Sequence, residues 1–230
     1  MNMEVSSNQY IESIHLFQNL ALLGDSMIDK NITLKTYERN QIIYNIGDTA
    51  TEIYFVLSGR IKLANHSNNG KENIKSIIYE GDLFGEMGIL DDEIYSTRRD
   101  FAQALEDDTL VCYVSYENMK KMMEEYPELN RRLIKKVSKR LKRTEHRLES
   151  IMFKDARTRL IDFIKDLARD MGKPIGHEVL VKHRLTHQEI ASMTAISRQK
   201  VTTLLNELKQ ENLIHLERKS LLIRDLQVLK

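Results

Sequence analysis

The stretch LTHQEIASMTAISRQKVTTLLNELK, residues 185–209, predicts two short helices joined by a tight turn. Thr186 and Glu189 have the spacing of a capping box, which opens a helix. The segment Thr194-Ala195-Ile196 then interrupts the apolar periodicity, and Ser197 is a residue type that caps a second helix. This order of caps and break predicts a helical hairpin.

The second helix of this hairpin has two chemically different faces. The apolar stripe repeats at helical spacing and consists of Val201, Leu204, Leu205 and Leu208. The opposite face is polar and consists of Arg198, Gln199, Thr202, Thr203 and Asn206. Short hydrogen-bonding side chains with an arginine near the helix N-terminus suit base edges in a major groove. The pattern predicts a DNA-reading helix-turn-helix, and an ordinary amphipathic hairpin with a solvated outer face is the alternative.

Two short apolar runs follow the hairpin, at residues 212–214 and 221–223. They flank the charged turn Glu217-Arg218-Lys219-Ser220. Short runs around such a turn are typical of a two-stranded hairpin. The C-terminal part is therefore predicted to be a winged helix-turn-helix.

Length and composition limit the class of protein. At 230 residues the chain has room for two modest domains with real cores. Neither a bilayer-spanning apolar run nor an export signal is present in the sequence, so we expect a cytoplasmic protein without a membrane partner. The single Cys112 excludes an internal disulfide framework and a four-thiolate iron–sulfur cluster within the chain.

Charge is unevenly distributed along the chain. The formal net charge is only +1, but residues 155–230 carry fourteen Lys/Arg against ten Asp/Glu. Residues 131–147 carry nine Lys/Arg and one glutamate, which leaves the preceding sequence acidic. This distribution favours phosphate contacts by the second half of the chain alone.

Most of the first half of the chain is predicted to form β-strands. Residues 1–30 predict short helices, with helical spacing of Ile11, Ile14, Phe17, Leu20 and Leu23. Short β-prone runs then recur at residues 32–34, 41–44, 53–57, 60–63, 74–78, 102–105 and 110–114. They are separated by turn signals at residues 47–48, 58–59, 68–70 and 80–82. Many short strands at this spacing predict a β-barrel or jelly roll.

A long basic helix is predicted over residues 126–153. Its seam alternates spacings of three and four, the coiled-coil pattern, through Ile134, Val137, Leu141, Thr144, Leu148 and Ile151. A parallel second copy of the chain would cover this seam, and two-fold symmetry suits half-site reading. The alternative is that the seam packs on its own β domain. Thr144, polar in an apolar seam, needs a partner across the dimer, in its own backbone or in a ligand.

A candidate anion site lies between two predicted strands, in residues 81–90. Gly85 allows close approach of the backbone to a ligand, and a short helix from Glu86 would aim free N–H groups at an anion. Arg98 is suited to clamp a phosphate or carboxylate. Glu86 would accept from a sugar hydroxyl or pair with an arginine.

The order of these parts and their local motifs resemble the Crp/Fnr (cAMP receptor protein / fumarate–nitrate regulator) family of bacterial transcription regulators. The resemblance runs from about Phe17 to Leu222 and rests on these motifs: Gly47-Asp48, residues 56–60, Gly81-Asp82-x-Phe84-Gly85-Glu86, the basic helix, Asp155-x-x-x-Arg159-Leu160, and Leu185-Thr186-x-Gln188-Glu189-Ile190-Ala191 running into Ser197-Arg198. It implies a ligand-sensing, cyclic-nucleotide-binding-like β-roll, a dimerisation helix and a winged helix-turn-helix that recognises a palindromic promoter site.

The effector site implied by the resemblance departs from the pattern of cyclic-nucleotide members. Positions Gly85, Glu86, Arg98 and Thr144 agree, whereas Arg99 and Glu145 each stand where those members have serine. The loop before Arg98 is also about two residues longer. The effector-binding set is Gly85, Glu86, Met87, Arg98, Arg99, Thr144 and Glu145. Its ligand is a cyclic nucleotide, another small anionic effector, or none, and we expect neither an iron–sulfur cluster nor haem.

The DNA-binding set departs from the family's best-known members in the second helix. Arg198 agrees, but Gln199 replaces a glutamate and Thr203 a second arginine, so a different half-site is expected. Arg198 suits guanine O6 and N7, and Gln199 suits adenine. The phosphate-contacting positions that would fix register are Thr186, His187, Gln188 and Ser197, and Thr202 lies on the polar face.

Together these patterns predict an α+β chain with three parts: an effector-sensing double-stranded β-helix (jelly roll) over residues 1–125, a dimerisation helix over 126–153, and a winged helix-turn-helix over 154–230. The predicted function is a homodimeric, effector-gated transcription regulator with double-stranded DNA and RNA polymerase as partners. Constitutive DNA binding, or a small-molecule binding module without a DNA role, are the alternatives. The sequence contains no nucleophile elbow, P-loop, metal-ligand spacing or acid–base pair, so we expect no enzyme activity.

Overall fold

The computed structural model describes residues 16–17, 31–67, 70, 72–89, 97–183, 185–217 and 220–229. Its internal contacts divide the chain into two compact units, Met1–Arg140 and Leu141–Lys230. The boundary lies inside the long helix α4 (Pro127–Phe153). None of the helices formed by the described residues combines the length and apolar character needed to cross a bilayer.

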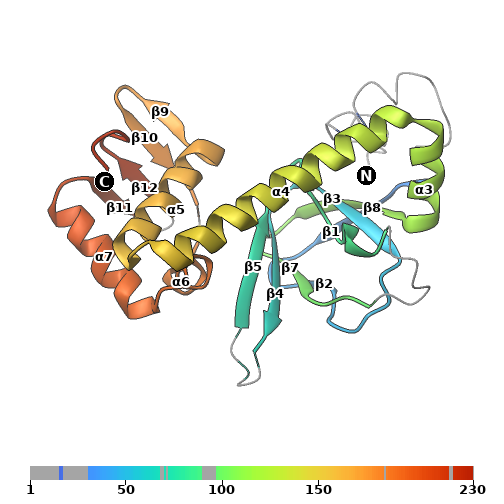
Figure 1. Ribbon diagram of the computed structural model, residues 1–230, viewed down its shortest axis with the longest axis horizontal. Helices are drawn as coiled ribbons and strands as arrows, with labels where there is room; N and C mark the ends of the chain where they lie inside the picture. Colours follow the sequence, from blue (N-terminus) through green and yellow to red (C-terminus); the bar gives the residue numbers. More distant parts are fainter. Residues whose placement is uncertain are drawn as a thin grey trace, which may run out of the picture. The chain divides into compact units, whose positions relative to one another are not determined.

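The first unit is a jelly roll of two four-stranded antiparallel sheets (Figure 1). The sheet orders are β1-β8-β3-β6 and β2-β7-β4-β5, so most neighbours are distant in sequence and the chain crosses repeatedly between sheets. The strands are β1 (Thr33–Tyr37), β2 (Ile42–Tyr44), β3 (Glu52–Ser58), β4 (Ile61–His66), β5 (Glu72–Ile78), β6 (Leu83–Phe84), β7 (Phe101–Ala104) and β8 (Thr109–Ser115). Each predicted run overlaps a strand, and the two-residue β6 was not predicted.

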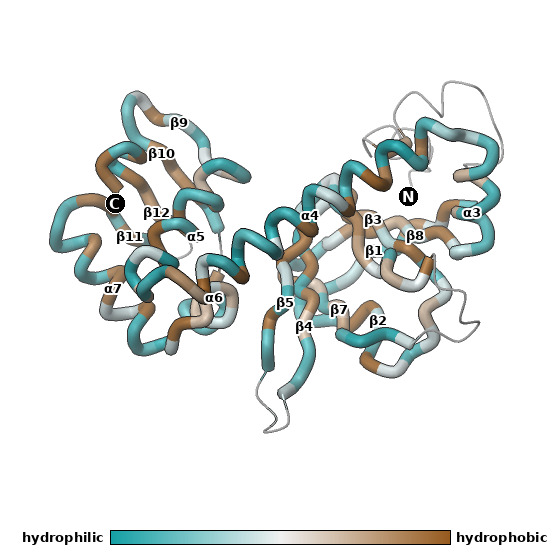
Figure 2. Tube along the Cα trace, viewed as in Figure 1, coloured by the Kyte–Doolittle hydropathy of each residue, from teal (hydrophilic) through white to brown (hydrophobic). Residues whose placement is uncertain are grey.

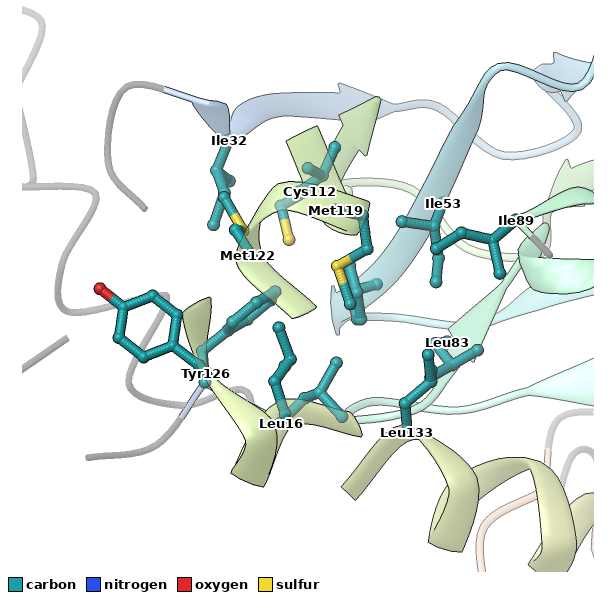
Figure 3. Close-up of a cluster of buried hydrophobic side chains, with 14 of the residues drawn as sticks. Leu16, Ile32, Ile53, Leu83, Ile89, Cys112, Met119, Met122, Tyr126 and Leu133 are labelled. Carbon is teal, nitrogen blue, oxygen red and sulfur yellow. The ribbon is translucent and has the colours of Figure 1, made fainter. Parts of the chain in front are cut away.

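Strand β3 contributes to two hydrophobic clusters formed by the described residues of this unit. Its alternate residues point to opposite faces, with Ile53 and Phe55 in one cluster and Tyr54 and Val56 in the other. Figure 3 shows the first cluster, where side chains of the helices meet the strands. In it Cys112 is fully buried, and burial raises the pKa of its thiol to about 12.

Helices α3 (Tyr116–Glu125) and α4 lead out of the roll. The Ser115 hydroxyl caps α3 by accepting from the Asn118 N–H, and Pro127 opens α4, where a missing N–H costs nothing. Leu129 and Leu133 are buried in the core of the roll. The rest of α4 is predominantly hydrophilic, with apolar positions at intervals (Figure 2).

The apolar seam of α4 is exposed over the rest of the helix. The exposed fractions are 64% for Ile134, 42% for Val137, 56% for Leu141, 59% for Leu148 and 39% for Ile151. Within the first unit, Ile134 and Val137 are thus left uncovered by the roll, although Lys136 and Arg140 of the same helix bond to it.

The second unit is a winged helix-turn-helix. Its helices are α5 (Ala156–Met171), α6 (His187–Thr194) and α7 (Arg198–Gln210). Its sheet has the order β11-β12-β10-β9 and is formed by β9 (Lys173–Ile175), β10 (Glu178–Val181), β11 (Ile214–Glu217) and β12 (Ser220–Ile223). The predicted wing corresponds to β11 and β12. The β9–β10 hairpin was missed because its strands have only three and four residues and β9 is exposed.

Several sequence predictions fall outside the described residues. These are most of the N-terminal helices, residues 68–69 of one turn, residues 90–96 of the lengthened loop, and residues 218–219 of the wing turn. Within residues 16–17, Phe17 is fully buried and packs edge-on against Phe55, with ring centroids 5.2 Å apart.

Candidate nucleic-acid interface and effector site

The helix-turn-helix has the caps that its sequence predicts. The Thr186 hydroxyl accepts from the Glu189 N–H (3.2 Å), and the Glu189 carboxylate accepts from the Thr186 N–H (2.6 Å), which completes the capping box. Ala195 ends α6 in the left-handed conformation (φ 53°). The Ser197 hydroxyl then accepts from the Lys200 N–H (3.2 Å) and opens α7. These local features fix where each helix begins and where α6 ends.

Helix α7 buries its apolar stripe and exposes its polar face. The buried residues are Val201, Leu204, Leu205 and Leu208. Arg198, Gln199, Thr203 and Asn206 are exposed, and Thr202 is half-buried. The structure therefore groups the predicted base-contacting residues on one accessible surface.

Two threonine hydroxyls on this face bond to the backbone of their own helix. Thr202 Oγ1 donates to the Arg198 carbonyl (3.0 Å), and Thr203 Oγ1 donates to the Gln199 carbonyl (3.1 Å). Because a hydroxyl has one hydrogen, Thr203 presents only acceptor lone pairs outward. Thr202 has a second partner, His187, whose Nδ1 lies 2.8 Å from its Oγ1.

Two arginines, on α4 and α5, donate to backbone carbonyls of the helix-turn-helix. Arg159 on α5 donates to the Ala195 carbonyl in the turn (3.2 Å) and to the Ile151 carbonyl near the end of α4 (3.3 Å). Arg147 on α4 donates to the Ser192 carbonyl of α6 (2.8 Å), and burial lowers the pKa of its guanidinium. The sequence showed Arg147 only as one of many basic residues, so this contact was missed.

Glu86 is the central acidic group of the candidate effector site. Its carboxylate is 7% exposed, and Oε1 accepts from Arg140 on α4 (2.8 Å). Oε2 is buried and has no hydrogen-bond partner among the described residues. Such a group is costly to bury unless a donor is supplied. Arg140, four residues before Thr144, was not predicted.

The turn before Glu86 differs from expectation in one respect. Gly85 has the positive φ of 76° that a close backbone approach requires. The next residues, however, form only the three-residue 3₁₀-helix η2 (Glu86–Gly88), which is too short for the anion-binding helix terminus that we predicted. Met87 is 85% exposed.

Arg98, the predicted anion clamp, is buried, with Nη1 and Nη2 on protein oxygens and Nε without a hydrogen-bond partner among the described residues. Nη1 donates to the carbonyl of Gly85 (2.8 Å) and to the hydroxyl of Tyr116 (3.1 Å), and Nη2 donates to the carbonyl of Glu52 (2.6 Å). The guanidinium carbon lies 4.4 Å from the centroid of Tyr44, with the rings of Tyr54 and Tyr116 also within cation–π range. Burial raises the pKa of all three phenols, which therefore stay neutral beside the cation.

The remaining effector positions are distributed over both units. Arg99 is exposed, and its carbonyl accepts from Lys75 (3.2 Å). Thr144 and Glu145 lie on the exposed surface of α4 in the second unit. The structure thus brings Gly85, Glu86 and Arg98 together within the roll. The described residues contain no group of three or more His, Cys, Asp or Glu side chains placed to hold a metal ion.

Comparison with known proteins agrees with this architecture. The chain matches the cyclic nucleotide-binding domain over residues 34–126 and the Crp-like helix-turn-helix domain over residues 158–230. Fold and site therefore define a DNA-binding transcription regulator with a cyclic-nucleotide-binding type of domain. The chain belongs to the Crp/Fnr family.

Relatives match over most of the chain. A global nitrogen regulator of Nostoc sp. is 30% identical over 190 residues, 83% of this chain and 84% of the relative. A CRP-like cAMP-activated global transcriptional regulator of Mycobacterium tuberculosis is 27% identical over 91% of this chain and 92% of its own. A solved structure of a CooA mutant from Carboxydothermus hydrogenoformans is 28% identical, with a TM-score of 0.75 over 91% of this chain and 93% of that one.

The packing around Gly85 predicts a difference between two glycine substitutions. A Cβ at position 85 would lie 2.8 Å from Arg98 Nη1 and 3.3 Å from the Glu52 carbonyl oxygen, whereas one at Gly81 (φ 79°) would meet nothing within 4 Å. Both substitutions incur left-handed strain, but only Gly85→Ala also displaces Arg98. We expect it to lower the free energy of unfolding by at least ~1 kcal/mol more than Gly81→Ala, measured by urea denaturation. Equal losses would contradict the contact.

Proposed function

We propose that this regulator acts as a homodimer that recognises a two-fold symmetric DNA site, with an affinity set by a small anionic effector. The observation that carries the proposal is the exposed polar face of α7, held by two helix caps and two arginine contacts. A helix presented in this way suits the major groove. RNA polymerase is the proposed protein partner at the promoter.

Recognition of bases is assigned to three residues of α7. Arg198, exposed in its first turn, suits bidentate donation to guanine. Gln199 suits adenine, and Thr203, whose hydroxyl hydrogen is used within the helix, suits the amino group of adenine or cytosine. Phosphate contacts that set register are assigned to Thr186, Gln188 and Ser197, together with His187.

Dimerisation is proposed to occur through the seam of α4. An apolar stripe with spacings of three and four on an otherwise basic helix suits knobs-into-holes packing with a second copy. Five of its six members are apolar and exposed. Pairing would place the two α7 helices for successive major grooves, roughly 34 Å apart.

Effector binding is proposed to use the unpartnered Oε2 of Glu86. A buried carboxylate oxygen of this kind favours a ligand that brings a hydroxyl or N–H donor, and Arg140 and Arg99 favour an anion. The cAMP-activated name of the Mycobacterium tuberculosis relative supports a cyclic nucleotide here. Because Arg140 lies on α4, a ligand at Glu86 would also act on the helix that carries the seam.

Constitutive DNA binding is a second candidate, favoured by one observation. The terminal Nη1 and Nη2 nitrogens of Arg98 donate to oxygens of the roll itself. An anion would therefore have to replace bonds that already exist. In this alternative the pocket is filled by its own side chains, and DNA affinity does not change with any effector.

We predict that Arg198→Ala weakens binding to a selected operator by ~1–3 kcal/mol and relaxes one base position in each half-site. The operator is first obtained by selection from random duplexes, and affinities are measured by fluorescence anisotropy. Lys209→Ala, in the exposed last turn of α7, is the matched control and should change neither affinity nor base preference. Equal weakening on all sequences would identify Arg198 as a phosphate contact instead.

The seam predicts that Leu141→Glu dissociates the dimer, because it buries a charge in the proposed interface. Sedimentation equilibrium should show at least a ~100-fold weaker self-association, with unchanged helix content by circular dichroism. Lys142→Glu changes the charge of the adjacent residue, which lies off the seam, and should leave the dimer intact. A monomeric wild-type protein would overturn the dimer proposal.

Calorimetric titration with cAMP and cGMP distinguishes the two effector proposals. A binding ligand should lose ~1.5–3 kcal/mol of affinity in Glu86→Gln, because a charged acceptor is removed. The same ligand should change operator affinity in the wild type but not in the variant. If neither nucleotide nor other small anions give heat or change operator affinity, constitutive binding is the function.

A further inference from the structure

His187 and Thr202 form a hydrogen bond that joins the two helices of the DNA-reading motif. His187 is the first residue of α6 and is exposed, whereas Thr202 is half-buried in the second turn of α7. His187 Nδ1 lies 2.8 Å from Thr202 Oγ1. His187, which is assigned to a phosphate contact, thus also contacts Thr202 on the polar face of α7.

The protons in this contact are determined by counting. Thr202 has a single hydroxyl hydrogen, and that hydrogen is directed at the Arg198 carbonyl, 3.0 Å away. In the arrangement that makes both contacts hydrogen bonds, Nδ1 of His187 carries the proton of the 2.8 Å contact. In a neutral imidazole with a proton on Nδ1, Nε2 carries only a lone pair.

We propose that His187 contacts a DNA phosphate only when its imidazole is protonated, and that Thr202 is the positioning residue that imposes this dependence rather than a base contact. The lone pair on Nε2 of the neutral ring repels a phosphate oxygen. When Nε2 takes up a proton, it donates to the phosphate while Nδ1 keeps its bond to Thr202. Each subunit then takes up one proton from solution when it binds DNA. The inference rests on the DNA-binding role of the motif.

The charged groups on the surrounding elements favour this coupling. On α6, the Glu189 carboxylate is committed to Thr186 through bonds to its N–H and its hydroxyl. On α7, Arg198 and Lys200 lie in the first turn, before Thr202. The contacts of Arg147 and Arg159 are at the opposite end of α6. A phosphate oxygen at Nε2 would bring a negative charge close to these cations.

The test measures the affinity for a 30-base-pair duplex of mixed sequence, because phosphate contacts do not depend on sequence. Affinities are determined as a function of salt at pH 6 and pH 8, a range over which imidazoles gain or lose a proton. Wild type is compared with His187→Asn, whose amide still donates to Thr202 but does not titrate. His177→Asn, in the exposed turn between β9 and β10, is the matched control.

When the pH is lowered from 8 to 6, the salt dependence of the affinity should increase in the wild type and in His177→Asn. The increase should correspond to about one more released counterion per subunit than in His187→Asn. The plot of log affinity against log salt concentration then steepens by about 0.9 per subunit. The same pH and salt dependence in wild type and His187→Asn would overturn the inference alone. Loss of all DNA binding at both pH values would overturn the DNA-reading role together with the inference.

Nitrogen-15 NMR of the histidine rings tests the role of Thr202 without DNA. The His187 resonance, identified by its absence in His187→Asn, should show the proton on Nδ1 at pH 8. Thr202→Val should move that proton to Nε2, whereas Thr203→Val, which loses an equivalent hydroxyl bonded to its own helix, should not. A proton on Nε2 in the wild type would overturn the assignment.

Discussion

The architecture depends on one continuous helix that meets two different packing requirements. The first turns of α4 complete the hydrophobic core of the roll, through Leu129 and Leu133. Beyond Ile134 its apolar residues face solvent, and its basic residues form bonds to neighbouring segments on both sides of the unit boundary. The same helix therefore belongs to the core of the first unit and to the contacts of the second.

Arginine side chains that donate to backbone carbonyls recur as links between elements of the structure. Arg98 joins the Gly85 turn, strand β3 and the start of α3, while Arg159 joins the end of α4 to the turn of the helix-turn-helix. Arginine suits this use because its planar group has five donors and stays charged when buried. The same property makes such residues hard to interpret from sequence, where each resembles a ligand-binding or surface residue.

Local patterns predicted much of the fold and of the local structure of the helix-turn-helix. The capping box at Thr186, the cap at Ser197 and the two faces of α7 depend on residues within one or two turns, so sequence contains them directly. The β9–β10 hairpin has no apolar alternation, because β9 is only three exposed residues and β10 ends in the continuous apolar run Val179–Val181. In the effector site, the Arg140–Glu86 pair joins residues 54 positions apart, and the tyrosine surroundings of Arg98 form only when both sheets close. Such contacts depend on tertiary packing, which no short-range spacing encodes.

Because Cys112 is buried, the reactivity of its thiol measures how often the jelly roll opens. With a pKa of about 12, roughly one thiol in 10⁵ is ionised at neutral pH. The hydrophobic side chains packed around Cys112 also keep reagents away from it. Alkylation of the folded chain therefore has to wait for the sheets to separate. The rate of modification reports how often this unit opens, independently of events at the winged helix, because the sequence has no other cysteine.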